Sequence, residues 1–380
     1  MKIKRLSSEI DAKKYLTKLN VDSGGIKILA NKMEQHLYYI SEMKTAAANI
    51  LKQDALSIGA DLAVPQGVIT YSTETVDAIL IGTRKHMEIL SRKELAQPFG
   101  LKEIAKNLKQ MLQTKGQTEI RLMGIVNAND DSFYANSRFK ESHAVKAIEQ
   151  MVSEGANIID IGAVSSRPGA KYVEPEDELK RVKPIIDALY LEKFHEKTIL
   201  SLDSYTPKVI SYALERGFHI INDITGLQND DVCKLVGEYN ATAVIMHMQN
   251  SPKNMQNNPS YSDVITEIDD FFLTRIEKAD HFSIKNLMLD VGIGFGKKLE
   301  HNLQLLQHLN HFKYHGFELL FGASRKSLID QILPTPVEER LSATIALHLK
   351  AVQNGATTLR VHDVKEHKQA LSIYHALLGV

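Results

Sequence analysis

The stretch Asp290-Val-Gly-Ile-Gly-Phe-Gly-Lys297 decides the fold, because it follows directly on the apolar run Leu287-Met-Leu289. Two more polar stretches, Ser324-Arg-Lys-Ser327 and Arg360-Val-His-Asp363, also stand at the ends of apolar, strand-like runs. In a (β/α)8 barrel, residues just past the strand ends form the active site. Polar and charged residues repeated at such positions predict a catalytic face. Because several of their side chains are basic, we expect this face to bind an anion.

The chain from residue 121 to residue 380 has the pattern of a complete (β/α)8 barrel. Its 260 residues are close to the roughly 250 typical of that fold. Short apolar segments alternate with helical patterns, as expected of parallel strands joined by crossover helices. The predicted strands are Leu122–Val126, Asn157–Ile161, Thr198–Leu202, His219–Ile221, Ala243–Met246, Leu287–Asp290, Glu318–Phe321 and Thr357–Val361.

A smaller domain is predicted before the barrel. The polar stretch Gln113–Glu119 marks the boundary, so we assign residues 1–116 to a small α/β N-terminal domain and residues 117–380 to the TIM barrel. No catalytic constellation stands out in the N-terminal domain, and its role is left open. We expect strands at Ile26–Leu29 and Ala78–Ile81, a turn at Gly24-Gly25, and helices near residues 31–57, 84–95 and 101–112.

Composition excludes several classes of partner. The chain has 46 basic and 46 acidic residues, which provide no overall field for nucleic acid or anionic lipid. The single cysteine, Cys233, cannot form an intramolecular disulfide, and the first residues lack the apolar core of a secretion signal. We expect a cytoplasmic protein that binds small molecules and neither nucleic acid nor membranes.

Polar side chains follow all eight predicted strands. A single Asp or Asn at such a place can be a helix N-cap, but polar side chains after all eight strands favour a common site. Asp203 and Asp290, with Asn222 between them, could accept hydrogen bonds from a flat heterocycle that carries amino and ring N–H groups. Lys326 could bond the ring's carbonyl group, and the planar guanidinium of Arg360 could stack on its face.

Four side chains suit phosphate oxygens near the ends of the last strands. They are Asn127, Arg167, Arg360 and His362, and barrels often hold phosphate in this region. The pattern Gly292-x-Gly-x-Gly296 indicates a tight turn from strand to helix. It lacks the spacing and the acidic ribose partner of a dinucleotide fingerprint.

From about Leu122 to the C-terminus, the chain resembles the dihydropteroate synthases. The resemblance rests on Met123–Phe133, Gly155–Ala170, Ile221–Ile224, Met246–Met248, Asp290–Lys297, Ser324–Ser327 and Arg360–Val364. It implies a (β/α)8 barrel that joins 6-hydroxymethyl-7,8-dihydropterin diphosphate to para-aminobenzoate and releases pyrophosphate in folate synthesis. It also implies a Mg²⁺ cofactor and a homodimer, whereas the N-terminal domain has no counterpart in the family's common core.

The resemblance also assigns roles to residues. Asp203, Lys326, Arg360 and His362 would be catalytic. Asp203, Asn222, Ile224, Met246, Asp290, Gly322, Lys326 and Arg360 would hold the pterin. Asn127, Arg167, Arg360 and His362 would hold the diphosphate, with Asn127 as the ligand of Mg²⁺. Phe133, Ser166, Pro168, Phe295 and Ser327 would form the para-aminobenzoate pocket, where sulfonamides would compete.

The chain departs from the family's pattern at three places. Asn129-Asp130 replaces Thr-Pro in the first loop, which removes a rigid φ and adds a charge near the diphosphate. Val164 stands where a glutamate is usual, and Val291 stands where a proline is usual. None of these changes removes a residue assigned above, so we expect activity with altered loop dynamics.

Two other functions fit part of the pattern. A methyltransferase that passes a methyl group from a folate to a corrinoid would share the barrel and part of the pterin pocket. The segments Ser324–Ser327 and Arg360–His362 argue against it, because its substrate lacks the diphosphate and carboxylate that they suit. A non-catalytic pterin-binding regulator of folate enzymes is the other alternative, favoured by the altered first loop and the additional domain.

Overall fold

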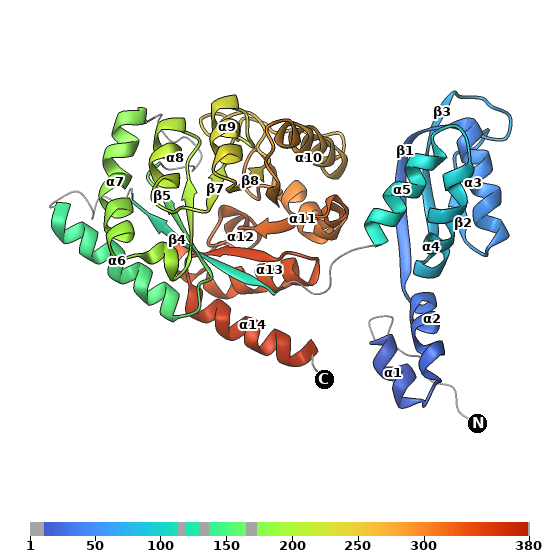
Figure 1. The fold of residues 1–380 in the computed structure, drawn as a ribbon, viewed down its shortest axis with the longest axis horizontal. Helices are drawn as coiled ribbons and strands as arrows, with labels where there is room; N and C mark the ends of the chain where they lie inside the picture. The colour runs from blue at the N-terminus through green and yellow to red at the C-terminus, as the bar shows by residue number, and fades with distance from the viewer. Residues whose placement is uncertain (1–10, 113–118, 129–136, 165–172, 379–380) are drawn as a thin grey trace. The chain divides into compact units, whose positions relative to one another are not determined.

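The computed structural model describes residues 11–112, 119–128, 137–164 and 173–378. The chain forms two compact units, Met1–Gly116 and Gln117–Val380, and each is described by itself (Figure 1). Among the helices that the structure describes, none is both long and apolar enough to cross a membrane.

The N-terminal unit is a small α/β fold around a three-stranded antiparallel sheet in the order β1-β3-β2. One sheet face packs on buried residues of α3 and α4, with Leu51, Leu80 and Leu90 fully buried in the shared core. Its elements are α1 Ala12–Lys18, α2 Ser23–Met33, β1 Gln35–Lys44, α3 Thr45–Ser57, β2 Asp61–Ala63, β3 Thr75–Thr83, α4 Arg84–Lys93, the 3-10 helix Glu94–Ala96 and α5 Leu101–Leu112.

The predicted strand at Ile26–Leu29 and the turn before it are wrong, because this segment lies in α2. The Asp22 side chain accepts a hydrogen bond from the Gly24 backbone N–H at 2.9 Å, which caps the helix and places both glycines in its first turn. A short apolar run is ambiguous between strand and helix when only periodicity is considered.

The predicted helix near residues 31–57 is wrong over its middle part. Residues Gln35–Lys44 form β1, which pairs with β3 so that Leu37 lies opposite Ile81 and Tyr39 lies opposite Ile79. Pairing of this aromatic and β-branched segment with a neighbouring strand overrides its local helical pattern. The strand at Ala78–Ile81 and the helices near 84–95 and 101–112 are confirmed by β3, α4 and α5.

The second unit is a closed barrel of eight parallel strands, which confirms the predicted fold class. Each strand pairs with the next along the chain, and β11 closes the barrel by pairing with β4. The strands are β4 Arg121–Asn127, β5 Ile158–Gly162, β6 Ile199–Asp203, β7 Ile220–Asp223, β8 Thr242–Met246, β9 Asn286–Asp290, β10 Glu318–Phe321 and β11 Thr358–Val361.

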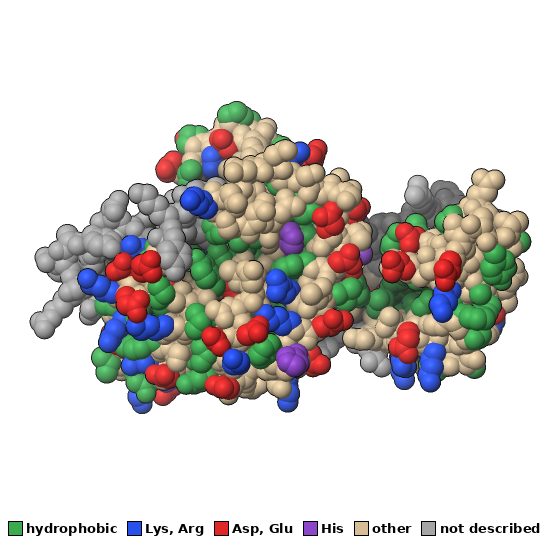
Figure 2. All heavy atoms as spheres, turned by 90° about the horizontal axis from the view of Figure 1, so that it is seen from above, with side chains coloured by type: hydrophobic (Ala, Val, Ile, Leu, Met, Phe, Trp, Pro, Cys, Tyr) green, Lys and Arg blue, Asp and Glu red, His purple; other side chains and the backbone are tan. Residues whose placement is uncertain are grey.

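Helices surround these strands, as Figure 1 shows. They are α6 Ser137–Ser153, α7 Pro175–Leu191, α8 Pro207–Leu214, α9 Asp230–Glu238, α10 Val264–His281, α11 Leu299–Gln307, α12 Ser327–Ile332, α13 Leu341–Gln353 and α14 Val364–Leu378. Within the described part of this unit, 3-10 helices lie at Phe194–Glu196, Leu309–His315 and Val337–Glu339. Acidic and basic side chains are interspersed over the face that Figure 2 presents, in agreement with the equal numbers of both charges.

The strands are buried on both faces, and their side chains alternate between two cores. Met123, Ile158, Ile220, Val244, Met288 and Leu320 form a layer inside the barrel, whereas their neighbours in sequence belong to the core that includes helix residues. Because the side-chain period of a strand is two, the residue two positions after each interior residue faces inward one layer higher. That layer lies toward the carboxyl ends of the strands, where barrels carry their active sites.

We predict that a chain beginning at Gln117 folds without the N-terminal unit. The two cores of the barrel contain described residues from position 120 onward, and the core of the N-terminal unit ends at Leu112. Domains with separate cores can fold independently. The shortened chain should melt cooperatively by calorimetry. A broad, non-cooperative transition would show that the barrel depends on residues before Gln117.

Candidate active site

A pocket opens at the carboxyl ends of the barrel strands. Most of its side chains come from the inward-facing positions above the interior layer. Asn222, for example, stands two residues after Ile220, and Asp290 stands two residues after Met288. The pocket is lined by Ile125, Asp203, Asn222, Ile224, Met246, Asp290, Phe295, Gly322, Ser324, Lys326, Arg360 and His362.

Two carboxyl groups in this pocket are deeply buried. Asp203 at the end of β6 is 9% exposed, and Asp290 at the end of β9 is 7% exposed. Burial raises the pKa of both, and it raises that of Asp203 to about 7 although the Arg360 guanidinium opposes the shift. Asp290 also accepts a hydrogen bond from the Gly292 N–H at 2.8 Å. Buried carboxyl groups of this kind suit a ligand that supplies N–H donors.

Arg360 on β11 is held by two carboxylates from β5 and β6. Its Nε donates to Oδ2 of Asp160 at 2.6 Å, and its Nη2 donates to Oδ2 of Asp203 at 2.7 Å. Asp160, which is fully buried, also accepts from Ser201 Oγ at 2.6 Å and from Asn222 Nδ2 at 3.1 Å. The guanidinium is thereby fixed in orientation before any ligand binds.

Sequence reasoning missed Asp160, although a signal was present. It is a charged residue within the apolar run of β5, two positions after the interior residue Ile158. The same spacing relates Asn222 to Ile220, so the alternation of β5 could have placed Asp160 in the site.

Lys326 reaches into the pocket from the start of α12. Its ammonium group donates to the Ile293 carbonyl oxygen at 2.5 Å and lies 4.7 Å from the centre of the Phe295 ring. Burial lowers the pKa of Lys326 to about 8, although the Asp290 carboxylate opposes the shift. A cation placed beside a buried carboxyl group can donate to a carbonyl oxygen of a ligand.

The glycine-rich loop after β9 forms the tight turn predicted from its sequence. Gly292, Gly294 and Gly296 all have positive φ, and a Cβ on Gly292 would lie 2.0 Å from the His247 carbonyl oxygen. Only glycine fits such a contact. Lys297, for which the sequence suggested no role, anchors this loop by donating to the backbone carbonyl oxygens of Phe295 at 2.9 Å and His247 at 3.2 Å.

The structure brings together ten of the residues assigned by sequence. They are Asp203, Asn222, Ile224, Met246, Asp290, Phe295, Gly322, Lys326, Arg360 and His362. Ser327 is exposed at the start of α12, and Asn127 is half-buried at the end of β4; neither lines this pocket. The predictions for Phe133, Ser166, Arg167 and Pro168, and for Asn129-Asp130, fall outside the described residues.

The described residues contain no cluster of three or more His, Cys, Asp or Glu side chains that could hold a metal ion by themselves. Mg²⁺ that travels with a diphosphate needs only one or two protein ligands, since phosphate oxygens and waters complete its octahedron. The Asn127 side chain, at the carboxyl end of β4, is compatible with that requirement.

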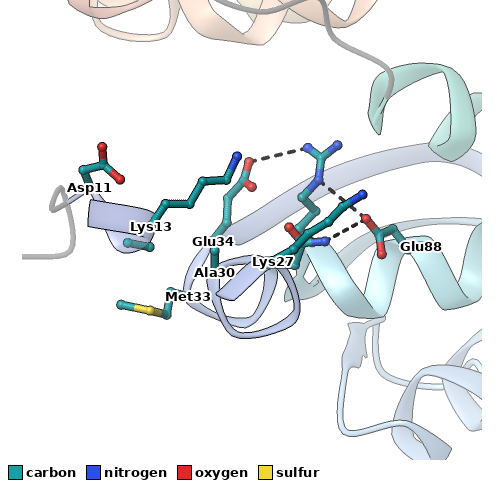
Figure 3. Close-up of a pocket in the computed structure, with 10 residues that line it drawn as sticks. Asp11, Lys13, Lys27, Ala30, Met33, Glu34 and Glu88 are labelled. Carbon is teal, nitrogen blue, oxygen red and sulfur yellow. Dashed lines mark hydrogen bonds and ion pairs between the residues drawn. The ribbon is translucent and has the colours of Figure 1, made fainter. Parts of the chain in front are cut away.

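The N-terminal unit contains a cleft of its own, of about 610 Å³ (Figure 3). Lys13 and Lys27 line it from α1 and α2, and Arg84 lies between two glutamates, with Nη1 3.8 Å from Glu34 and Nε 3.7 Å from Glu88. Sequence analysis identified no site here, because these charges are spread over α1, α2, α4 and the residue that follows α2.

Comparison with known proteins defines the class. Residues 123–362 match the model of the family described as pterin binding enzyme. The match covers the strands that supply the buried carboxyl groups, so the barrel is that of a pterin-binding enzyme.

Individual relatives narrow this class. Dihydropteroate synthase of Escherichia coli K12 is 40% identical over 261 residues, which are 68% of this chain and 92% of that protein. A Helicobacter pylori protein named bifunctional dihydropteroate synthase/dihydropteroate reductase is 37% identical over 381 residues, 99% of both chains. The chain belongs to the dihydropteroate synthase family, whose members are transferases.

Solved structures agree with this assignment. Yersinia pestis dihydropteroate synthase, solved as a sulfonamide drug complex, has a TM-score of 0.65 and 38% identity, covering 70% of this chain and 99% of that one. The Xanthomonas albilineans enzyme with 4-aminobenzoic acid has a TM-score of 0.63 and 36% identity, covering 69% and 94%.

We predict that Asp203 makes stability depend on pH. Its pKa rises from 3.8 to about 7 on folding, so its contribution to stability is present below about pH 4 and lost as the pH rises through about 7. Asp203→Asn does not titrate at this position. As the pH rises from about 5 to about 8, the melting temperature of the variant should therefore rise relative to that of the wild type. A gain of at least about 2 to 4 °C in melting temperature, which corresponds to about 1 kcal/mol, is expected.

The matched control is Asp280→Asn, at an exposed position of α10. Its melting temperature should follow that of the wild type across the same range. A constant difference between Asp203→Asn and the wild type would contradict the prediction.

Proposed function

We propose that this dihydropteroate synthase condenses 6-hydroxymethyl-7,8-dihydropterin diphosphate with para-aminobenzoate to give 7,8-dihydropteroate and pyrophosphate. The observation that carries the proposal is the joint placement of Asp203, Asn222, Asp290 and Lys326 in one buried pocket of a family member.

The pterin ring fits the polarity of this pocket. Its amino and ring N–H groups would donate to Asp203 and Asp290, and its carbonyl group would accept from Lys326. Asn222 is bonded to Asp160 through its amide nitrogen, so its amide oxygen can face the ligand. Ile224, Met246 and Gly322 shape the slot. An analogue without these donors would leave buried acceptors unpaired, which makes the pocket selective.

The diphosphate would lie beside Arg360, His362, Arg167 and Asn127. A guanidinium has five N–H donors, and the described contacts of Arg360 with Asp160 and Asp203 use two of its nitrogens. The remaining N–H donors of Arg360 can meet phosphate oxygens. Mg²⁺, held by Asn127 and the diphosphate, would supply positive charge to the leaving group.

The para-aminobenzoate pocket would combine Phe295 and Ser327 with Phe133, Ser166 and Pro168. Phe295 already lines the pterin pocket, so the aryl ring would lie next to the reacting methylene. Sulfonamides mimic the aryl amine and should compete for this place. The homodimer remains a prediction.

The reaction needs little general-base catalysis. The neutral aryl amine attacks the pterin methylene carbon, the C–O bond to the diphosphate breaks, and the new secondary amine loses one proton to water. Arg360 and His362 would stabilise the negative charge on the departing pyrophosphate. A buried carboxylate would offset positive charge that develops on the methylene and the ring.

We expect purified protein to form dihydropteroate and pyrophosphate from both substrates with Mg²⁺. Arg360→Ala and His362→Ala should each lower kcat by about 10² to 10³, because donors aimed at a leaving group act most strongly in the transition state. His281→Ala, at an exposed position of α10, is the control and should turn over like the wild type.

Other results would support the alternatives. Tight pterin binding without product would favour a non-catalytic regulator, and methyl transfer from a folate to a corrinoid would favour the methyltransferase. A double variant Arg360→Ala/His362→Ala with full turnover would contradict the assigned roles.

We propose a second activity, reduction of 7,8-dihydropteroate to 5,6,7,8-tetrahydropteroate, that depends on the N-terminal unit. The relative named for both activities matches 99% of this chain, whereas relatives named only for the synthase match about two thirds of it. The reaction adds one hydride and one proton across a C=N bond and requires a hydride donor, such as a reduced nicotinamide or flavin.

The reductase is tested by supplying dihydropteroate with each class of donor and measuring donor oxidation and tetrahydropteroate. We expect turnover by the full chain. The chain beginning at Gln117 should retain the synthase and lose the reductase, because only the N-terminal unit is removed. Reduction by that shortened chain would place the activity in the barrel, and none by the full chain would exclude it for these donors.

A further inference from the structure

Two buried histidines connect the segment that carries Lys326 to the segment that carries His362. His348 on α13 is 0% exposed, and His367 on α14 is 2% exposed. The Ala323 backbone N–H donates to Nε2 of His348 at 3.0 Å, His348 Nδ1 lies 2.9 Å from His367 Nε2, and His367 Nδ1 lies 2.6 Å from the Asp363 carbonyl oxygen.

The two ends of this chain fix where its protons lie. A backbone N–H can only donate, so Nε2 of His348 accepts and its Nδ1 carries the proton. That proton is donated to Nε2 of His367, whose Nδ1–H then donates to the Asp363 carbonyl group. Every bond is satisfied only if both rings are neutral. Burial keeps them so, because it lowers the pKa of His367 and holds that of His348 well below its usual value.

The ends of the chain lie next to functional residues. Ala323 immediately precedes Ser324, Arg325 and Lys326, and Asp363 immediately follows His362. Direct contacts join the same two segments: Ser324 Oγ lies 2.9 Å from His362 Nδ1, and Arg325 forms a two-pronged ion pair with Asp363 at 2.7 and 3.0 Å.

Arg325 shows why these segments need support. It has a φ of 55°, a left-handed conformation that is strained for residues other than glycine. Its flanking residues, Ser324 and Lys326, both line the pocket, while its own side chain bonds to Asp363. Such a conformation persists only where the surrounding structure holds it.

We propose that His348 and His367 are positioning residues for the synthase reaction, which act as a neutral hydrogen-bond relay that fixes the β10–α12 segment against the β11–α14 segment. The relay touches no substrate. It sets the distance between Lys326 on one segment and Arg360 and His362 on the other, and so the fit of the site to the pterin and its leaving group. This inference rests on the proposed synthase function.

The relay is tested first without activity. In the full chain labelled with ¹⁵N-histidine, NMR should show both rings neutral and protonated on Nδ1 at neutral pH. His348→Gln and His367→Asn identify the two signals. A charged ring, or a proton on Nε2 of either ring, would overturn the proposal.

Kinetics then test positioning. His348→Leu leaves the Ala323 N–H without an acceptor and should lower kcat by about 10- to 100-fold, the effect of small misplacements in a catalytic site. The KM for para-aminobenzoate should change much less. His348→Gln keeps an acceptor facing Ala323 and should recover most of the turnover. If His348→Leu does not fold, His367→Asn, which keeps a donor for Asp363 but removes the acceptor for His348, should lower kcat by a similar factor.

The matched control is His315→Leu. His315 is also buried and bonded to a protein group, Asp269 at 2.8 Å, but it stands before β10 at the opposite end of the strand from the pocket. The His315→Leu variant should have a lower melting temperature than the wild type and an unchanged kcat. Wild-type kcat in His348→Leu, or an equal loss in His315→Leu, would overturn the proposal. An inactive wild type would contradict the synthase function instead, and the NMR result would still decide the relay.

Discussion

The pocket depends on the ion pairs that Arg360 forms with Asp160 and Asp203. They join β11 to β5 and β6 across the open end of the barrel, at distances of 2.6 and 2.7 Å. Removing one partner of a buried ion pair leaves a charge without compensation and typically costs about 3 to 5 kcal/mol. Ser201 and Asn222 satisfy further acceptor sites of Asp160, so this arrangement is bonded on several sides. The orientation of Arg360 is therefore set by the folded barrel and not by the ligand.

Burial of several charged groups in one pocket also moves the pKa values of Asp203 and Lys326 toward neutral pH. The pKa of Asp203 is raised to about 7 and that of Lys326 is lowered to about 8, in each case chiefly by loss of hydration. Near neutral pH, a ligand that donates to carboxyl groups favours their charged form, and one that accepts from Lys326 favours its charged form. A pterin does both, whereas an apolar ring of the same shape would do neither. The electrostatics of the pocket thus favour the heterocycle that the family model indicates.

The sequence was sufficient to predict the barrel and the residues at its mouth, because both follow from one regularity. Parallel strands end at one edge, and polar residues after apolar runs mark that edge. Asp160 was missed because it was counted as part of a strand, although the inward alternation that places Asn222 also places Asp160. Lys297 was missed because two of its three bonds go to backbone carbonyl groups, which have no sequence signature, and the third goes to the ring of His247, fifty residues earlier in the chain. In the N-terminal unit, β1 was mistaken for a helix, since its pairing with β3 is a contact over some forty residues.

The barrel positions the two halves of its site by different means. One part of the pocket is built mainly from strand residues such as Asn222 and Asp290, and ladder hydrogen bonds fix them. Ser324 and Lys326, which also line the pocket, come from irregular backbone that no ladder holds and that includes the left-handed residue Arg325. Side chains must supply the missing constraints there, and they do so through Arg325 with Asp363, Ser324 with His362, and the two buried histidines. A neutral imidazole suits the interior link because it donates and accepts at once without bringing a charge into the core. A lysine or a carboxylate at the same place would have to be desolvated as an ion, and an aliphatic side chain would leave the Ala323 N–H unsatisfied.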